Sequence, residues 1–132
     1  MKFEPSLGDA AFRAEVREFI RQHLPPDMAR RSYICSQPPD IDDFRRWQRM
    51  LDDRGWGAPH WPVEHGGTDW TAMQRHIFMD EMYRADAIDY GWQGTHMIGP
   101  VLIAFGSEAQ QRRYLPPMLR GEEFWCQGFS EP

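Results

Sequence analysis

The chain has 132 residues, of which 41% are hydrophobic and 14% aromatic, so it can form one globular domain and lacks the composition of a disordered chain. Its formal net charge is −5 and its arginines are interleaved with acidic residues, so no basic stripe is available and we expect no nucleic-acid partner. The two cysteines lie far apart, the N-terminus shows no signal-peptide pattern, and no apolar run approaches about 18 residues, so we predict a cytoplasmic protein without a membrane span.

The first predicted element is a helix over residues 9–24, where apolar side chains recur at helical spacing. Pro25-Pro26 should end this helix, because proline lacks the N–H that a helix interior needs. Residues 28–39 follow, and we expect them to form a surface loop. The apolar residues of the predicted helix are Phe12, Val16, Phe19, Ile20 and Leu24.

A second helix is predicted from Ile41 to Leu51, with Asp40 as its N-cap and Gly55 as its C-terminal stop. Residues 55–70 are rich in glycine and proline, a composition that excludes regular structure. This loop carries three tryptophans, which indicates that it packs against another part of the protein.

Two further helices are predicted in the middle of the chain. One starts near Thr71, and the other runs from about Thr95 to Gly106. Pro100 falls near the first turn or two of the second of these helices, where its missing N–H costs least. Apolar residues of the first of them are Met73, Ile77, Phe78 and Met82.

The C-terminal stretch combines several structural signals. Ser107 and Gln110 have the spacing of a capping box, which predicts the start of a helix. Pro116-Pro117 should break that helix, and the aromatic-rich residues 124–129 are typical of a strand. The predicted fold class is therefore all-α, a bundle of four to five helices followed by a short C-terminal β-strand segment.

Metal and nucleotide motifs are missing. No glutamate is followed three residues later by histidine, there is no HExxH, and no GxGxxG follows a strand, so we predict neither a di-iron site nor a zinc site nor a nucleotide-binding turn. Asp80 and Glu81 are adjacent and would point about 100° apart on a helix, which favours an ion-paired or solvated helix face over a catalytic pair.

Two stretches carry a more specific pattern. LDDRGWGAPHWPVEHGGTDWTAMQRHIFMDEMYRAD holds a P-x-x-x-G-G loop followed by a helix that ends in an acidic pair. GPVLIAFGSEAQQRRYLPPMLRGEEFWCQGFSEP holds the elements GP, FGSE, Q-R-x-Y-L-P and a final S-E-P. With the amphipathic first helix, these motifs in this order resemble the N-terminal domain of acyl-CoA dehydrogenases. The resemblance implies a helical domain over residues 1–123, and over residues 124–132 the first strand and the start of the FAD-contacting turn of a β-domain.

The resemblance implies a flavoenzyme of fatty acid or lipid metabolism that uses FAD to convert an acyl-CoA thioester into a trans-2-enoyl-CoA. It further implies an electron-accepting flavoprotein as partner and a homo- or hetero-oligomer. The family's catalytic glutamate lies beyond the β-domain, so no residue here matches it and we expect this chain alone to be inactive. The final CQGFSEP resembles a bacterial branch acting on bulky, dicarboxylic or steroid-side-chain thioesters. The alternative is a non-catalytic helical interaction or acyl-binding module derived from the family.

The resemblance also implies site residues. Gln127, Phe129 and Ser130 would lie against the flavin, Ser130 as a hydroxyl donor, although strand pairing and capping would explain the same residues. Residues 88–96 correspond to the segment that closes the far end of the acyl pocket, although aromatic side chains there fit simple packing equally well. The candidate pocket residues are Tyr90, Trp92, Gln93 and Met97.

Overall fold

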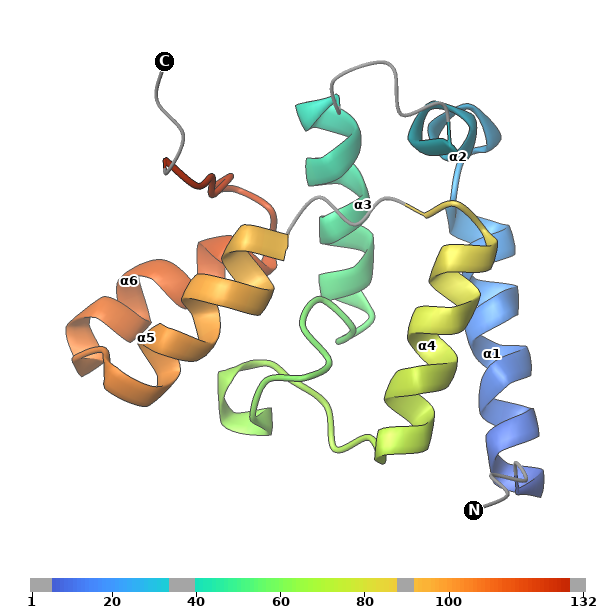
Figure 1. The fold of residues 1–132 in the computed structure, drawn as a ribbon, viewed down its shortest axis with the longest axis horizontal. Helices are drawn as coiled ribbons and strands as arrows, with labels where there is room; N and C mark the ends of the chain where they lie inside the picture. The colour runs from blue at the N-terminus through green and yellow to red at the C-terminus, as the bar shows by residue number, and fades with distance from the viewer. Residues whose placement is uncertain (1–5, 34–39, 88–91, 129–132) are drawn as a thin grey trace. The chain divides into compact units, whose positions relative to one another are not determined.

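The structure is a computed structural model that describes residues 6–33, 40–87 and 92–128. Within these ranges every regular element is helical, which confirms the predicted all-α fold (Figure 1). None of the helices found there is long and apolar enough to cross a membrane. The elements are α1 Leu7–His23, α2 Pro26–Tyr33, α3 Ile41–Asp53, η1 Val63–His65, α4 Ala72–Arg84, η2 Trp92–Ile98, α5 Gly99–Phe105 and α6 Glu108–Leu119.

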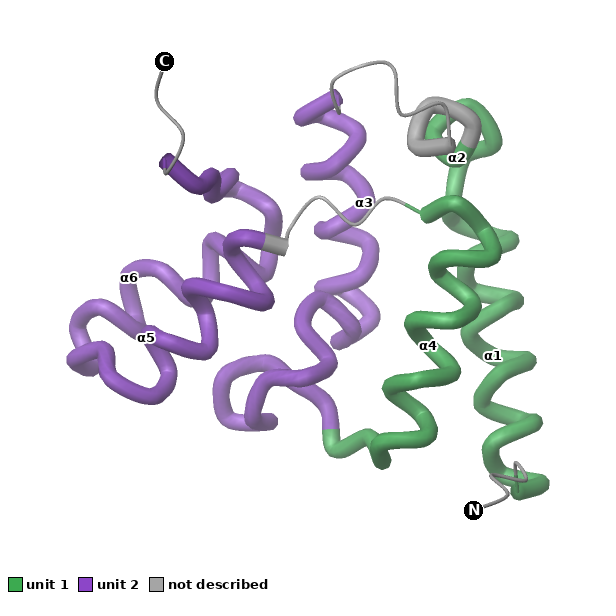
Figure 2. The backbone as a smooth tube through the Cα atoms, viewed as in Figure 1, with its two compact units in different colours: residues 1–38, 69–88 green, residues 39–68, 89–132 purple. Residues whose placement is uncertain are grey.

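The chain divides into two compact units (Figure 2). Unit 1 contains residues 1–38 and 69–88, and unit 2 contains residues 39–68 and 89–132. Each unit therefore combines two separate stretches of the sequence.

Unit 1 is built on the packing of α1 against α4. Both helices begin with a capping box, formed by Ser6 with Asp9 and by Thr71 with Gln74, so exposed backbone N–H groups at both starts are satisfied. The start predicted near Thr71 is confirmed. The buried apolar residues of the two helices are Phe12, Val16, Phe19, Ile20, Ile77, Phe78 and Met82.

An ion-pair network links these two helices. Arg13 donates to Asp80 at 2.6 Å and also pairs with Glu81, whose side chain is only 4% exposed. Arg17 Nε donates to Glu81 Oε2 at 2.8 Å. The hydrogen bond from Arg17 lowers the pKa of Glu81, and that from Arg13 lowers the pKa of Asp80. The prediction that Asp80 and Glu81 form an ion-paired helix face is confirmed.

The prediction of a surface loop over residues 28–39 is wrong for its first part, because Pro26–Tyr33 forms α2. Pro26 is the first residue of that helix, a position where the fixed φ of proline favours a helix and its missing N–H has no partner to lose. The side chain of Met28 is fully buried, so packing also stabilises the helix. The same proline pair that follows one helix therefore begins the next.

In unit 2, α3 matches its prediction at both ends. Asp40 accepts a hydrogen bond from the backbone N–H of Asp42 as N-cap, and Gly55 has the left-handed φ of +78° that a helix stop requires. Gln48 donates to the backbone oxygens of Gly57 and Leu119, both at 2.9 Å, and so ties α3 to the following loop and to α6. The loop 55–70 contains one turn of 3-10 helix, at Val63–His65, which the sequence did not predict.

The capping box of Ser107 with Gln110 is confirmed, but the predicted break at Pro116-Pro117 is wrong: both prolines lie inside α6. The helix continues through them to bury Leu115, Met118 and Leu119. Because they lack N–H groups, the two prolines cannot donate to the carbonyls of Arg112 and Arg113, four residues earlier. Gly121, with φ +66°, then closes the helix.

The predicted strand is also wrong as far as it is described. Residues 124–128 form no strand, and the rest of the segment lies outside the described residues. A strand requires a partner strand for its backbone hydrogen bonds, and the described ranges contain none.

Candidate functional site

The described part of the predicted acyl-pocket segment lies on η2, which runs directly into α5 (Figure 1). The helix predicted from Thr95 to Gly106 is therefore confirmed, although it starts earlier and its first part is a π-helix. Gln93 is partly buried and Met97 is 40% exposed. Tyr90 and the side chain of Trp92 lie outside the described part of the chain.

Pro100 accounts for the irregular hydrogen bonding of this turn. In a π-helix the N–H of residue i+5 donates to the carbonyl of residue i, and the residue five positions after Thr95 is Pro100, which has no N–H. The Thr95 carbonyl instead accepts two side-chain hydrogen bonds, from His60 Nε2 at 2.8 Å and from Trp61 Nε1 at 2.7 Å. Both donors come from the loop before η1.

Trp61 is held in place by glycines. Its side chain is 2% exposed, and a Cβ atom at Gly99 would overlap its indole ring. A Cβ atom at Gly67 would overlap the Trp61 carbonyl oxygen. The side chain packs with Ala58 and with Leu115, Met118 and Leu119 of α6. The expectation that the tryptophan-rich loop packs against another surface is confirmed for Trp61 and for the buried Trp56.

His60 and His96 form a stacked pair, with ring centroids 4.1 Å apart and an interplanar angle of 26°. Burial, with a smaller effect from His60, lowers the pKa of His96 to about 4. The ring of His96 is therefore neutral at pH 7 and stacks on His60 without charge repulsion. No group of three or more metal-ligating side chains occurs among the residues that the structure describes.

One described residue of the predicted flavin-binding set lies beside the predicted pocket set. Gln127 is exposed, and its Nε2 lies 3.9 Å from Met97 Sδ, which places one residue of each predicted set in contact. Phe129 and Ser130, the other two predicted flavin contacts, lie outside the described residues.

Trp125 connects the same two segments. A Cβ atom at Gly94 would lie 3.2 Å from the Trp125 ring, and that ring makes an edge contact with Tyr114 at a centroid distance of 5.7 Å. Its buried Nε1 has no hydrogen-bond partner among the residues that the structure describes. A small cavity of about 10 Å³ lies at this point, lined by Phe44, Gly94, Thr95, Met118, Glu123, Phe124 and Trp125.

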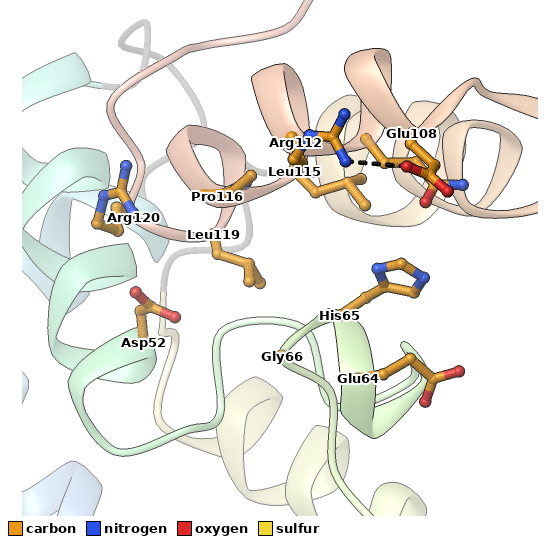
Figure 3. A pocket seen from close by; sticks show the side chains of 11 residues that line it. Asp52, Glu64, His65, Gly66, Glu108, Arg112, Leu115, Pro116, Leu119 and Arg120 are labelled. Carbon is orange, nitrogen blue, oxygen red and sulfur yellow. Dashed lines mark hydrogen bonds and ion pairs between the residues drawn. The ribbon is translucent and has the colours of Figure 1, made fainter.

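A larger pocket in unit 2, of about 440 Å³, contains none of the predicted site residues (Figure 3). Glu108 and Arg112 of α6 line it and pair with each other at 3.0 Å, while His65 and Asp52 lie on other parts of its wall. Burial raises the pKa of Asp52, against the opposing effect of Arg120. No sequence motif marked this pocket, because its lining comes from three separate stretches of the chain.

Sequence reasoning missed four residues that shape the candidate site: His60, Trp61, Gly99 and Trp125. Each acts through a residue distant in sequence, so no local spacing could reveal its role. Pro100 was the one available signal, because a proline beyond the first turn of a helical stretch deprives an earlier carbonyl group of its backbone donor.

Known proteins match nearly the whole chain. The family "Acyl-CoA dehydrogenase, N-terminal domain" matches residues 8–122. Acyl-CoA dehydrogenase IpdE1 of Mycolicibacterium smegmatis is 38% identical over 125 residues, which cover 92% of this chain and 32% of the relative. The chain thus spans about a third of the length of the curated relatives it matches.

Two solved structures share the fold. The ChsE4-ChsE5 complex from Mycobacterium tuberculosis matches with a TM-score of 0.80 and 26% identity, covering 100% of this chain and 32% of the matched chain. The Tcur3481-Tcur3483 steroid ACAD matches with a TM-score of 0.79 and 28% identity, covering 100% of this chain and 34% of the matched chain. The chain belongs to the acyl-CoA dehydrogenase family, whose N-terminal domain it represents.

Proposed function

We propose that this chain is the N-terminal part of an FAD-dependent acyl-CoA dehydrogenase that converts an acyl-CoA thioester into a trans-2-enoyl-CoA. The observation that carries the proposal is the match of the family's N-terminal domain to residues 8–122, supported by similar folds in two solved relatives. In this proposal residues 1–123 form the helical domain and residues 124–132 begin the β-domain. We place the reaction in the cytoplasm on the sequence pattern alone.

FAD, when bound, accepts the hydride that leaves Cβ of the substrate. Gln127, Phe129 and Ser130 would contact one edge of it, Ser130 through its hydroxyl. The described residues fit such an edge, because the backbone over residues 122–128 belongs to no helix or strand and Gln127 is exposed. The buried N–H of Trp125, close to this segment in the chain, also finds no acceptor within the described part of the chain. By the family resemblance, the carboxylate that removes the α-proton lies outside this sequence.

The acyl chain would end against η2. Tyr90, Trp92, Gln93 and Met97 are the residues we propose for the blind end of the pocket. The contact between Gln127 and Met97 supports this assignment, because Met97 belongs to the proposed pocket end and Gln127 to the proposed flavin edge. Bulk at these positions would limit the length and width of the acyl groups that fit.

The solved relatives suggest a substrate class and an assembly. They include a ChsE4-ChsE5 complex and a steroid ACAD. We therefore propose a bulky acyl-CoA thioester, such as one with a steroid-derived acyl group, as substrate. We also propose that the whole protein assembles with itself or with a related subunit and passes electrons to an electron-accepting flavoprotein.

A non-catalytic interaction module is the second candidate. It is favoured by apolar side chains that follow one face of η2 and α5 at helical spacing: Met97 is 40% exposed, Val101 52% and Phe105 86%. Such a surface suits contact with another protein as well as contact with further parts of an enzyme. Only the dehydrogenase requires flavin.

The deciding experiment uses the whole protein that contains this chain. We expect a yellow protein with about one FAD per chain that oxidises acyl-CoA thioesters in the presence of an artificial electron acceptor. The substrates tested should include straight-chain, dicarboxylic and steroid-side-chain thioesters. A colourless protein that oxidises none of them would refute the enzyme and favour the interaction module. This chain by itself should be colourless and inactive.

A further inference from the structure

We propose that His60 and Trp61 are positioning residues that hold the π-helical turn of η2, and with it the end of the acyl pocket, by donating to the Thr95 carbonyl. The inference rests on the proposed function only in its reference to the acyl pocket. The term "carbonyl clamp" denotes below the two hydrogen bonds from His60 Nε2 and Trp61 Nε1 to that oxygen.

The Thr95 carbonyl has two donors from outside its own helix. Thr95 is 4% exposed, so bulk water is not a ready partner for its backbone oxygen. Pro100 occupies the position of its π-helical donor and has no N–H to give. The two side-chain bonds, at 2.8 and 2.7 Å, give this oxygen donors that Pro100 cannot provide.

Both donors are fixed before they reach the carbonyl. The indole of Trp61 packs so closely on the backbone of Gly99 that even a Cβ atom there would overlap it, so the ring has no room to move toward α5. His60 is held by stacking on His96, which belongs to the same π-turn as Thr95. The loop therefore grips η2 at two points, the carbonyl of Thr95 and the ring of His96.

The protonation of the pair agrees with this geometry. A carbonyl oxygen only accepts, so His60 must carry its proton on Nε2 when it bonds Thr95. His96 is neutral at pH 7 because burial lowers its pKa to about 4. The charge of His60 adds a smaller lowering effect to the pKa of His96.

The carbonyl clamp affects the pocket because the π-turn sets how the side chains of η2 are oriented relative to one another. Gln93 and Met97 stand two residues before and two residues after Thr95 on η2. A π-turn holds one more residue than the corresponding α-turn, and each residue of an α-helix turns by about 100°. Relaxation of the π-turn into an α-turn would therefore rotate one of these side chains by about 100° relative to the other. The clamp thus determines which surface the pocket end presents to an acyl group.

The experiment compares four variants of the whole protein. Trp61→Phe and His60→Leu each remove one N–H of the clamp while keeping much of the side-chain volume. His60→Gln keeps an N–H donor near the position of Nε2 and should restore the parent behaviour. Trp56→Phe is the matched control, because it removes the indole N–H of another buried tryptophan in the same loop.

Two readouts are measured. The first is the ratio of kcat/KM between a bulky and a short acyl-CoA, with FAD content checked in every variant. We expect this ratio to change about tenfold in Trp61→Phe and His60→Leu, the size of effect that one methylene has in an apolar pocket, and by less than about twofold in the other two variants. The second is amide hydrogen exchange over residues 93–99, which should speed up at least about tenfold in the same two variants but stay unchanged in α3.

The outcomes separate the two proposals. Unchanged exchange over residues 93–99 in both Trp61→Phe and His60→Leu would overturn the clamp, whatever the activity. Faster exchange together with a flat kcat/KM ratio would overturn the part of the inference that links the clamp to the pocket. If the parent protein oxidises no acyl-CoA, the proposed function fails, and the exchange experiment still decides whether the clamp holds η2.

Discussion

Replacing Glu81 with Gln should lower the free energy of unfolding of this chain by about 2 kcal/mol. The Glu81 carboxylate accepts three hydrogen bonds from two guanidinium groups, one from Arg13 and two from Arg17, and is itself only 4% exposed. Hydrogen bonds to charged groups contribute about 1.5–3 kcal/mol each. Solvent screening reduces this sum, because Arg17 is 64% exposed and Arg13 28%, and Gln keeps the shape and one acceptor oxygen.

The difference between the two proteins should depend on pH with a defined sign. The hydrogen bond from Arg17 lowers the pKa of Glu81 in the folded state below its usual value of 4.5. The carboxylate therefore stabilises the fold fully above the unfolded-state pKa, and this contribution is lost as pH falls through the lower folded-state pKa. Glu81→Gln should thus be less stable than the parent at pH 7, and the difference should shrink as pH falls below 4.5.

Urea unfolding followed by circular dichroism measures both quantities at pH 7 and at pH 3. Glu18→Gln is the control, because Glu18 pairs with Arg21 on the exposed surface of α1, where loss of one ion pair should change stability little. A difference below about 0.5 kcal/mol between the parent and Glu81→Gln at pH 7 would refute the reasoning, since it would mean that solvent screens even a carboxylate as buried as this one.

Three further predictions concern single side chains. Folding lowers the pKa of His96 from 6.5 to about 4, so its contribution to the free energy of unfolding is complete above pH 6.5 and is lost toward pH 4, by up to roughly 3 kcal/mol. The free energy of unfolding of His96→Gln should therefore depend less on pH between 6.5 and 4 than that of the parent, and an equal dependence would contradict the assignment. Gly99→Ala should lower stability by about 1–3 kcal/mol or prevent folding, since its Cβ would overlap Trp61, whereas Gly128→Ala meets open space and should melt like the parent. In the whole protein, Ser130→Ala should weaken FAD binding by about 1 kcal/mol, or roughly fivefold in Kd, and an unchanged Kd would show that Ser130 does not bond the flavin.

The amino-acid sequence by itself determined the features that depend on neighbouring residues. The N-cap at Asp40, the stop at Gly55 and the capping box of Ser107 with Gln110 each complete their hydrogen bonds within about five residues. Apolar spacing likewise indicated which face of α1 is buried. These local patterns were sufficient to predict an all-α fold, and the ordered motifs were sufficient to indicate the family.

Tertiary structure decided the features in which local preference and packing disagree. Pro116-Pro117 would end an isolated helix, yet α6 continues through them because the residues on either side are buried. Residues 124–128 have strand-like composition, but a strand forms only with a partner, and none lies within the described ranges. In α6 the burial of apolar side chains outweighs the helix-breaking preference of proline. In residues 124–128 the lack of a partner strand outweighs the strand preference of the side chains.

The candidate site divides in the same way. Motif positions indicated Gln127 and Met97, and the structure places these two side chains in contact. His60 and Trp61 lie 35 and 34 residues from Thr95 in the sequence, and nothing in their local spacing indicates that they donate to its carbonyl. A side chain donates to a backbone carbonyl when the fold brings the two together, and only the tertiary structure determines which carbonyl that is.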